Sequence, residues 1–144
     1  MPKKPEQRRS VCPINYALEI FGDRWTLLVV RDLVFEGKRT FTEFAESDEQ
    51  ISTNILTDRI MLLEREGIIS KSPNQGRGSK YRYDLTEKGF DLLPILVEII
   101  LWSGKHDADT VLPKAYVQMI KRDKAAFIKN AIKAYKDGGS VKPK

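Results

Sequence analysis

Short polar side chains recur along one side of a segment that begins at Ser52 and ends at Gly67. Thr53, Asn54 and Thr57 share this side when successive residues are placed about 100° apart, as in an α-helix. In the major groove of DNA, Asn pairs with adenine through two hydrogen bonds, and the Thr methyl group contacts the methyl group of thymine. The residue types and their spacing therefore favour a helix whose outer side reads bases.

The rest of this segment predicts how the helix is held. Ser52 is expected to cap its start, and Asp58 lies at the edge of the polar side, which Met61 and Arg65 continue. Arg59 falls within the apolar side, where we expect it to pair with a carboxylate such as Glu66 or Glu43, or to reach a phosphate. An ordinary surface helix would show the same two sides, so this segment alone leaves the question open. The residues of the apolar side are Ile55, Leu56, Ile60, Leu62 and Leu63.

A basic hairpin is predicted directly after this helix. Strand-like runs at 68–72 and 80–85 flank a turn that contains Gly76 and Gly78. Arg77, between these two glycines, is free to enter a minor groove or to contact phosphate. Helix and hairpin together favour DNA binding over a merely solvated surface. The cations of residues 70–83 are Lys71, Arg77, Lys80 and Arg82, whereas the acids Glu43, Glu46, Asp48 and Glu49 precede Ser52.

The remaining pattern predicts a mainly α-helical chain with one small β-hairpin. A basic, flexible arm (1–11) precedes a DNA-binding domain (12–104), a helical extension (105–136) and a disordered tail (137–144). We expect Pro13 to open a first helix, Asp23 to cap a second, and Thr40 to open a third through Glu46. Thr86 is expected to cap one long helix to about residue 103, bent at Pro94, and a last helix is expected from 114 to about 136.

The composition excludes several classes of function. A chain of 144 residues fits one domain with extensions, and its net charge of +5 suits an anionic partner such as nucleic acid without proving one. No apolar run reaches the roughly 18 residues that a membrane-spanning helix needs. The lone Cys12 fits a reducing cytoplasm, and one Cys with one His does not build a zinc site. We find no nucleophile–base set and no glycine-rich phosphate loop, so we expect no enzyme, no metal and no cofactor.

Several motifs follow one another along the chain: Cys12-Pro13, Gly22-Asp-Arg-Trp-Thr-Leu-Leu-Val-Val-Arg-Asp-Leu33, Arg39-Thr-Phe-Thr-Glu-Phe44, Ile51-Ser52, Leu56-Thr-Asp-Arg-Ile60, Leu63-Glu-Arg-Glu-Gly67 and Tyr83-Asp-Leu-Thr-Glu-Lys-Gly89. In this order they resemble the HxlR-type branch of the MarR-like winged-helix regulators. The resemblance covers about residues 8–104 and implies a winged helix-turn-helix fold with N- and C-terminal dimerisation helices. It implies a cytoplasmic, nucleoid-associated homodimer that binds near-palindromic double-stranded DNA and regulates transcription. Family members often carry basic residues where this chain has Asn54 and Met61.

On these grounds the predicted DNA interface comprises Arg39, Thr42, Ser52, Thr53, Asn54, Thr57, Asp58, Arg77 and Lys80. Half-sites are expected about one helical turn apart.

Cys12 is a candidate sensor. It precedes Pro13 at a helix start, where exposed N–H groups and the helix dipole favour a thiolate. The resemblance adds that some family members sense oxidants or electrophiles through the cysteine at this position. A small capping residue without chemistry is the favoured alternative, and no small-molecule effector is identified.

The C-terminal helices allow two interpretations. The apolar side of the last helix either packs on its own domain or clasps a second subunit. We favour the dimer, because the helix before it is too apolar for one domain to cover. Trp25 and Trp102 are predicted to anchor the core or this interface. The apolar residues of the last helix include Tyr116, Ile120, Phe127, Ala131 and Tyr135.

Two alternatives to a sequence-specific regulator remain. The basic arm, the hairpin and the Lys-rich last helix would also suit a chromosomal architectural protein that binds DNA of any sequence. A winged helix can also serve as a protein-interaction module, since a fold does not fix a function.

Overall fold

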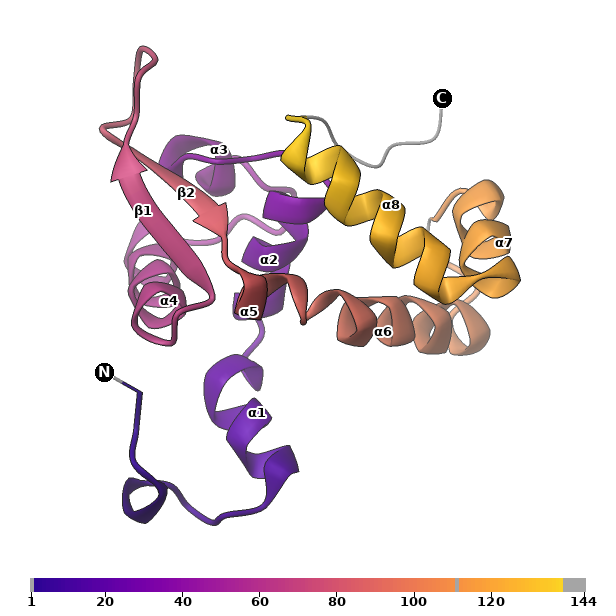
Figure 1. Cartoon of the computed structure of the whole chain (residues 1–144), viewed down its shortest axis with the longest axis horizontal. Coiled ribbons are helices and arrows are strands. Elements are labelled where there is room, and N and C mark those ends of the chain that lie inside the picture. The colour runs from indigo at the N-terminus through magenta and orange to yellow at the C-terminus, as the bar shows by residue number, and fades with distance from the viewer. Residues whose placement is uncertain (1, 111, 139–144) are drawn as a thin grey trace.

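The computed structural model describes residues 2–110 and 112–138. Its elements are a short 3-10 turn (Pro5–Gln7), α1 (Pro13–Phe21), α2 (Thr26–Val34), α3 (Phe41–Ala45), α4 (Thr53–Arg65), β1 (Ile69–Pro73), β2 (Tyr81–Leu85), α5 (Glu87–Phe90), α6 (Leu93–His106), α7 (Lys114–Arg122) and α8 (Lys124–Lys136). The hairpin, α3 and α4 lie at one end of the molecule, and α6, α7 and α8 lie at the other (Figure 1). Helix α1 projects from below α2, away from both groups (Figure 1).

Helix α1 begins and ends where the sequence predicts. Cys12 is its N-cap residue, Pro13 occupies the first turn, and Gly22 is the C-cap. Ile14 and Leu18 on this helix are 70% and 50% exposed, so one apolar side of α1 is not covered by its own chain. The preceding arm contacts the helix, because the Arg8 guanidinium lies 4.7 Å from the centre of the Tyr16 ring.

Three helices form the core that positions the candidate site. Asp23 accepts hydrogen bonds from the backbone N–H groups of Trp25 and Thr26, which caps the start of α2 as predicted. The Thr40 hydroxyl accepts from the Glu43 N–H at the start of α3. The buried apolar residues that join α2, α3 and α4 include Val30, Leu33, Val34, Phe44, Leu56 and Leu63.

The hairpin follows α4 through Gly67, whose φ of 74° lies in the left-handed region that glycine adopts without strain. Strands β1 and β2 pair antiparallel, with Ile69 opposite Leu85 and Pro73 opposite Tyr81. The Thr86 hydroxyl donates to the backbone oxygens of Gly67 and Ile68, which closes the base of the hairpin. The predicted wing is therefore present at the predicted place.

Two predicted helices are each divided in the structure. The helix expected from Thr86 to about residue 103 is α5 followed by α6, and Pro94 lies in the first turn of α6 rather than at a bend. Proline suits that turn because its missing N–H would have no partner there in any case. The helix expected from 114 to 136 breaks at Asp123, whose side chain accepts from the Ala126 N–H at 3.0 Å and so caps α8.

Helix α8 packs on its own domain. Ala131 and Tyr135 belong to the main core, and the Tyr135 hydroxyl accepts a hydrogen bond from the Leu85 N–H at 2.8 Å. The Phe90 and Tyr135 rings meet edge to face, with centroids 5.3 Å apart. For this side of α8 the structure therefore supports packing on its own domain, and a contact of the C-terminal extension with a second subunit stays a prediction.

In the described residues, no helix combines the length and the apolar character that a membrane crossing requires. Except for Asp137 and Gly138, the predicted tail 137–144 lies outside the described residues.

Candidate nucleic-acid interface

The outer side of α4 is polar and accessible. Thr53, Asn54, Thr57 and Asp58 are all exposed, and the Ser52 hydroxyl caps the helix by accepting from the Ile55 N–H at 3.3 Å. The Thr57 hydroxyl donates to the Thr53 backbone oxygen at 2.8 Å, which leaves it only acceptor capacity for an outside partner. Both side chains of the predicted base-reading pair, Asn54 and Thr57, therefore face solvent.

The inner side of α4 departs from the prediction at two positions. Leu56, Ile60, Leu62 and Leu63 are buried as expected, but Ile55 is 36% exposed. Arg59 pairs with a carboxylate, yet its partner is Asp23 at 3.5 Å rather than Glu66 or Glu43. Asp23 lies before α2 and thus far from Arg59 in sequence, which is why helix periodicity did not identify it.

The wing turn is built around Asn74. Its N–H donates to the Lys80 backbone oxygen at 2.9 Å, and its side-chain amide donates to the Ser79 oxygen at 2.8 Å. Gly78 adopts a φ of 97°, which a residue with a side chain rarely does. Arg77 is exposed at this turn and makes no hydrogen bond or ion pair within the described part of the chain. Its charge is thus available to an external anion.

Two further cations of the wing lie on one aromatic ring. The Lys71 and Lys80 ammonium groups are 3.8 Å and 5.5 Å from the centre of the Tyr81 ring. Both lysines are exposed, so Tyr81 supports them without neutralising their charge. Arg82 differs, because it pairs with Asp84 at 3.1 Å on the same strand.

Thr42 connects the wing to the helix-turn-helix. Its hydroxyl lies 2.8 Å from the Ser79 hydroxyl, although 37 residues separate them in the chain. This hydrogen bond joins α3 to the wing turn, so the turn that carries Arg77 is positioned relative to the helices.

Arg39 does not belong to the exposed surface, which corrects one predicted interface residue. It is 9% exposed, and its guanidinium donates to the backbone oxygens of Leu33 and Lys38 at 2.8 and 3.0 Å. The same group lies 3.7 Å from the centre of the Tyr135 ring, and burial lowers the pKa of Arg39. Its role is to join the α2–α3 loop to α8, since this guanidinium is committed to protein partners.

An ion-pair network that the sequence did not predict fixes the turn between α3 and α4. Arg31 of α2 binds Glu49 of the turn through two hydrogen bonds of 2.6 and 2.8 Å, and also binds Asp32. The buried Asp32 accepts from the Ser47 hydroxyl and pairs with Lys38 at 3.5 Å. The hydrogen bonds from Arg31 hold the pKa of Glu49 below its usual range. Arg31 and Glu49 are 18 residues apart in the chain, so no local pattern in the sequence indicates that they pair.

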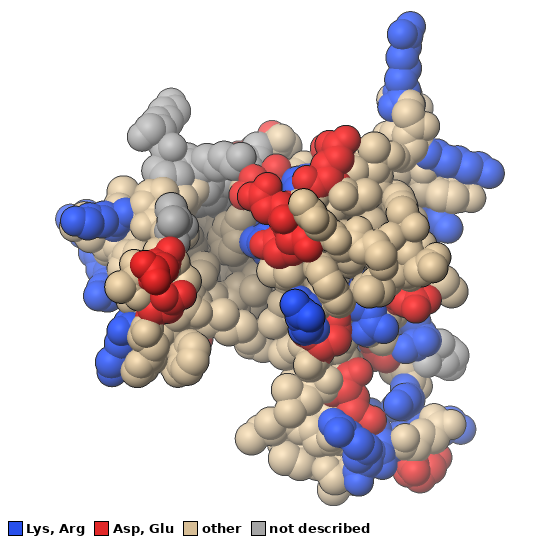
Figure 2. Space-filling view, turned by 180° about the vertical axis from the view of Figure 1, so that it is seen from behind, with Lys and Arg blue, Asp and Glu red and all other residues tan. Residues whose placement is uncertain are grey.

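Charge is unevenly distributed over the molecule. Figure 2 shows Lys and Arg on the projecting wing and a group of acidic side chains nearer the middle of the same face. The exposed acids of α3 and its following turn are Glu43, Glu46, Asp48 and Glu49. Because DNA repels carboxylates, this arrangement favours contact through the wing and the outer side of α4 over contact through the turn.

Cys12 lies outside this surface. It is exposed at the N-cap of α1, and its side chain caps no N–H group there. Among the described residues, no cluster of three or more His, Cys, Asp or Glu side chains could hold a metal ion.

The tryptophans take different positions. Trp25 is partly buried against the core, whereas Trp102 is 68% exposed on α6. Only Trp25 therefore anchors the core of this chain, and the interface role of Trp102 remains a prediction.

Comparisons with known proteins agree with this geometry. The family model described as HxlR-like helix-turn-helix matches residues 20–110. The uncharacterized HTH-type transcriptional regulator YdeP of Bacillus subtilis (strain 168) is 32% identical over 95 residues, which are 66% of this chain and 73% of YdeP. For some other curated relatives the match spans 64% or 58% of their length.

Solved structures show the same fold. The putative transcription factor PA1607 is 36% identical with a TM-score of 0.62, over 73% of this chain and 70% of PA1607. The reduced form of the transcriptional regulator YodB from B. subtilis is 27% identical with a TM-score of 0.56, over 70% of this chain and 99% of YodB.

Proposed function

This chain belongs to the HxlR-like helix-turn-helix family of DNA-binding transcription regulators, and on that premise we propose that it binds a specific operator as a homodimer. It is a regulator and not an enzyme, as its relatives are. The observation that carries the proposal is the exposed outer side of α4, where Thr53, Asn54 and Thr57 present short polar side chains.

In this proposal the first two turns of α4 enter the major groove. Short side chains allow the helix backbone to approach the base edges closely, and the Asn54 amide pairs with adenine. The Thr57 methyl group is available to a thymine, because its hydroxyl donates to Thr53. Ser52 and Asp58 flank this pair as further exposed polar groups.

The wing contributes affinity for DNA without sequence specificity. Arg77, Lys80 and Lys71 are exposed and meet the phosphate backbone beside the helix. The hydrogen bond between Thr42 and Ser79 keeps the wing turn at a set position from α3. Each phosphate contact releases a counterion, so binding weakens steeply as salt is added.

The dimer rests on apolar side chains that this chain leaves uncovered. Val11 and Ile14 near the start of α1 are 80% and 70% exposed, and Trp102 on α6 is 68% exposed. Large apolar side chains that are exposed on a helix in this way are candidates for a protein contact. A twofold pair joined by α1 and α6 would present two copies of α4 to half-sites about one helical turn apart.

Cys12 is the proposed point at which oxidants or electrophiles act. Its thiol is exposed at the start of α1, the helix proposed to join the subunits. The similar regulator YodB from B. subtilis has been solved with quinone bound. Modification of Cys12 would add bulk and polarity at the dimer contact and so alter operator binding. Mass spectrometry after quinone treatment, with Cys12→Ser as control, tests this step through the presence or absence of an adduct.

The test of the main proposal is selection of bound fragments from a genomic pool, followed by mobility-shift titration. The proposal expects one recurring near-palindromic site, bound at least about a thousandfold more tightly than an unrelated duplex of equal length. Equal affinity for unrelated duplexes would instead support the sequence-independent architectural protein. Failure to bind any duplex at low salt would support a protein-interaction module.

A further inference from the structure

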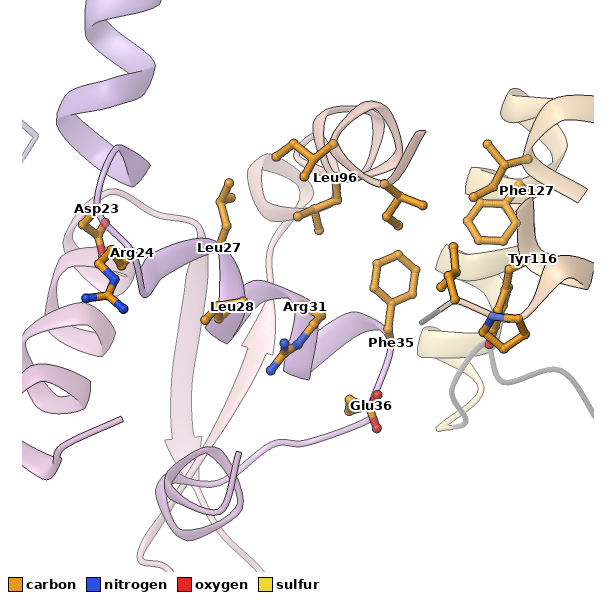
Figure 3. Close-up of a pocket in the computed structure, with 15 residues that line it drawn as sticks. Asp23, Arg24, Leu27, Leu28, Arg31, Phe35, Glu36, Leu96, Tyr116 and Phe127 are labelled. Atoms are coloured by element: carbon orange, nitrogen blue, oxygen red, sulfur yellow. The ribbon is translucent and has the colours of Figure 1, made fainter. Parts of the chain in front are cut away.

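A groove runs along the outer side of α2, between α6 and the C-terminal helices. It has a volume of about 750 Å³, within the range of about 300–1,000 Å³ that is typical of small-molecule sites. In Figure 3, Leu27 and Phe35 point from α2 toward α6, and Tyr116 and Phe127 approach from the C-terminal helices. We call this space the α2–α7 groove. Leu27, Phe35, Ile99, Tyr116 and Phe127 are among its apolar lining residues.

Much of this lining comes from outside the family match. The match ends at residue 110, whereas Tyr116, Ile120 and Phe127 belong to α7 and α8. Ile120 and Phe127 are 0% and 3% exposed, so they lie behind the accessible lining, in the buried cluster on which Tyr116 packs. The volume of about 750 Å³ suits a small molecule.

Four charged residues border the groove, and three of them have partners within the chain. Asp23 accepts hydrogen bonds from the Trp25 and Thr26 N–H groups, and Arg31 binds Glu49. Burial, and to a smaller extent the nearby Glu36 carboxylate, raises the pKa of Tyr116. Arg24 differs from them, because it has no ion pair within residues 2–110 and 112–138 and lies 5.7 Å from the Trp25 ring. Arg24 and Arg31 lie along one edge of the groove in Figure 3. The available charge at this edge is thus a cation.

We propose that the α2–α7 groove binds an apolar organic acid whose carboxylate pairs with Arg24 and whose hydrocarbon body lies against Leu27, Phe35 and Tyr116. An apolar body matches the lining, and a guanidinium favours a carboxylate through charge-assisted hydrogen bonds. Helix α2 has nine residues and is therefore about 13 Å long, a length that suits the chain of a medium-chain fatty acid.

The groove is connected to the DNA-reading helix by a short set of contacts. Arg31 borders the groove and binds Glu49 in the turn before α4, at 2.6 and 2.8 Å. The adjoining Asp32 binds Ser47 of the same turn. A bound acid that packs against the methylene groups of Arg31 alters the Arg31–Glu49 hydrogen bonds that hold this turn. Binding of the acid therefore changes the affinity of the chain for DNA. This second step rests on the proposed function.

The binding step is tested on the full chain by calorimetric titration with dodecanoate below its micelle concentration. We expect one saturable site per chain, and Arg24→Gln is expected to weaken it about tenfold or more, since it removes a charged hydrogen bond. Arg122→Gln removes an exposed arginine of α7 outside the groove and should bind as the wild type does. Dodecanol should bind more weakly than dodecanoate.

Equal affinity of dodecanoate for wild type and Arg24→Gln overturns the site. So does the absence of saturable binding. Leu27→Trp is a second test variant. The larger side chain fills the groove, so it should abolish dodecanoate binding while the chain stays folded. If Leu27→Trp instead lowers the dimer fraction in sedimentation without dodecanoate, a second copy covers the groove and the proposal is wrong.

The coupling step is tested by operator titration with and without saturating dodecanoate. We expect the DNA dissociation constant to change about fivefold or more, and Glu49→Gln to bind dodecanoate while losing that change. An unchanged dissociation constant in the wild type overturns the coupling. Wild type that binds dodecanoate but no duplex would overturn the proposed function and leave the site intact.

Discussion

The surface formed by α4 and the wing differs from helices α1 and α6 in what each leaves uncovered. The first exposes Asn54, Thr57 and Arg77, whereas the second exposes Ile14 and Trp102. Polar groups and cations retain their hydration until a polyanion replaces it, but exposed apolar groups gain by being covered. The difference supports the proposal that α4 and the wing meet nucleic acid, whereas α1 and α6, which lie apart in one chain, each meet protein.

Two arginines sharpen this contrast. Arg39 and Arg77 are both basic residues of loops, and both were predicted to contact DNA. The Arg39 guanidinium is buried against backbone oxygens and Tyr135, whereas Arg77 is exposed at the wing turn. Position in the chain therefore says less about an arginine's role than the partners that surround its guanidinium.

The largest expected effect comes from Arg39. Arg39→Ala should lower the free energy of unfolding by about 2–3 kcal/mol, because two backbone oxygens lose a charged donor and Tyr135 loses its contact. Arg77→Ala, the matched control, should change it by less than about 0.5 kcal/mol. Urea denaturation followed by circular dichroism measures both values. Equal stability of the two variants would show that Arg39 is not structural.

Trp102 tests the protein-contact side. Trp102→Asp should weaken the dimer at least about tenfold, because buried aromatic residues dominate the energy of interfaces. Met61→Asp is the control, since Met61 is 62% exposed on α4 and outside the proposed contact. Sedimentation equilibrium measures the association. If both variants associate as the wild type does, α6 does not join the subunits.

Arg77 tests the wing. Arg77→Ala should weaken binding to every duplex by a similar factor. It should also reduce the slope of log affinity against log salt concentration by about one, because one phosphate contact is lost. Titrations at several salt concentrations, with operator and unrelated duplexes, give that slope. A loss confined to the operator would mean that Arg77 reads sequence rather than phosphate.

The smallest effect concerns Glu49 and pH. Arg31 lowers the pKa of Glu49 in the folded chain. The ion pair therefore stabilises the fold fully at pH values above the pKa that Glu49 has in the unfolded chain. This stabilisation is lost as the pH falls through the lower pKa that Glu49 has in the folded chain. The pair is partly exposed, so we expect less than about 1 kcal/mol. Wild type should lose more stability than Glu49→Gln between about pH 6 and pH 3 in thermal unfolding. Glu46→Gln, a neighbouring exposed carboxylate, should behave as the wild type does.

Local patterns in the sequence were sufficient to predict the helix α4 and the hairpin that follows it. Ser52 and Gly67 mark the ends of α4 through a cap and a left-handed backbone, both of which depend on residue type alone. The break between α5 and α6 was missed because apolar residues continue on both sides of Asp91. The break at Asp123 was missed although four charged residues (121–124) interrupt the apolar pattern there and Asp123 is a residue type that caps helices.

Contacts between distant segments were not predictable in the same way. The pair of Arg31 with Glu49, the pair of Arg59 with Asp23, and the packing of α8 on the hairpin depend on how helices meet in space. Arg39 shows the consequence, because its basic character suggested a DNA contact whereas its burial among Leu33, Lys38 and Tyr135 is a tertiary property.

Sequence-specific binding by this chain depends, in the proposed function, on the reading of bases by Asn54 of α4. The most direct measurement is the ratio of affinities for the selected operator and an unrelated duplex, compared between wild type and Asn54→Ala, with Asn130→Ala on α8 as the matched control. We expect Asn54→Ala to lose about 1–3 kcal/mol of discrimination while affinity for the unrelated duplex is kept, and Asn130→Ala to match the wild type. An unchanged ratio in Asn54→Ala would contradict the assignment of α4 as the reading helix.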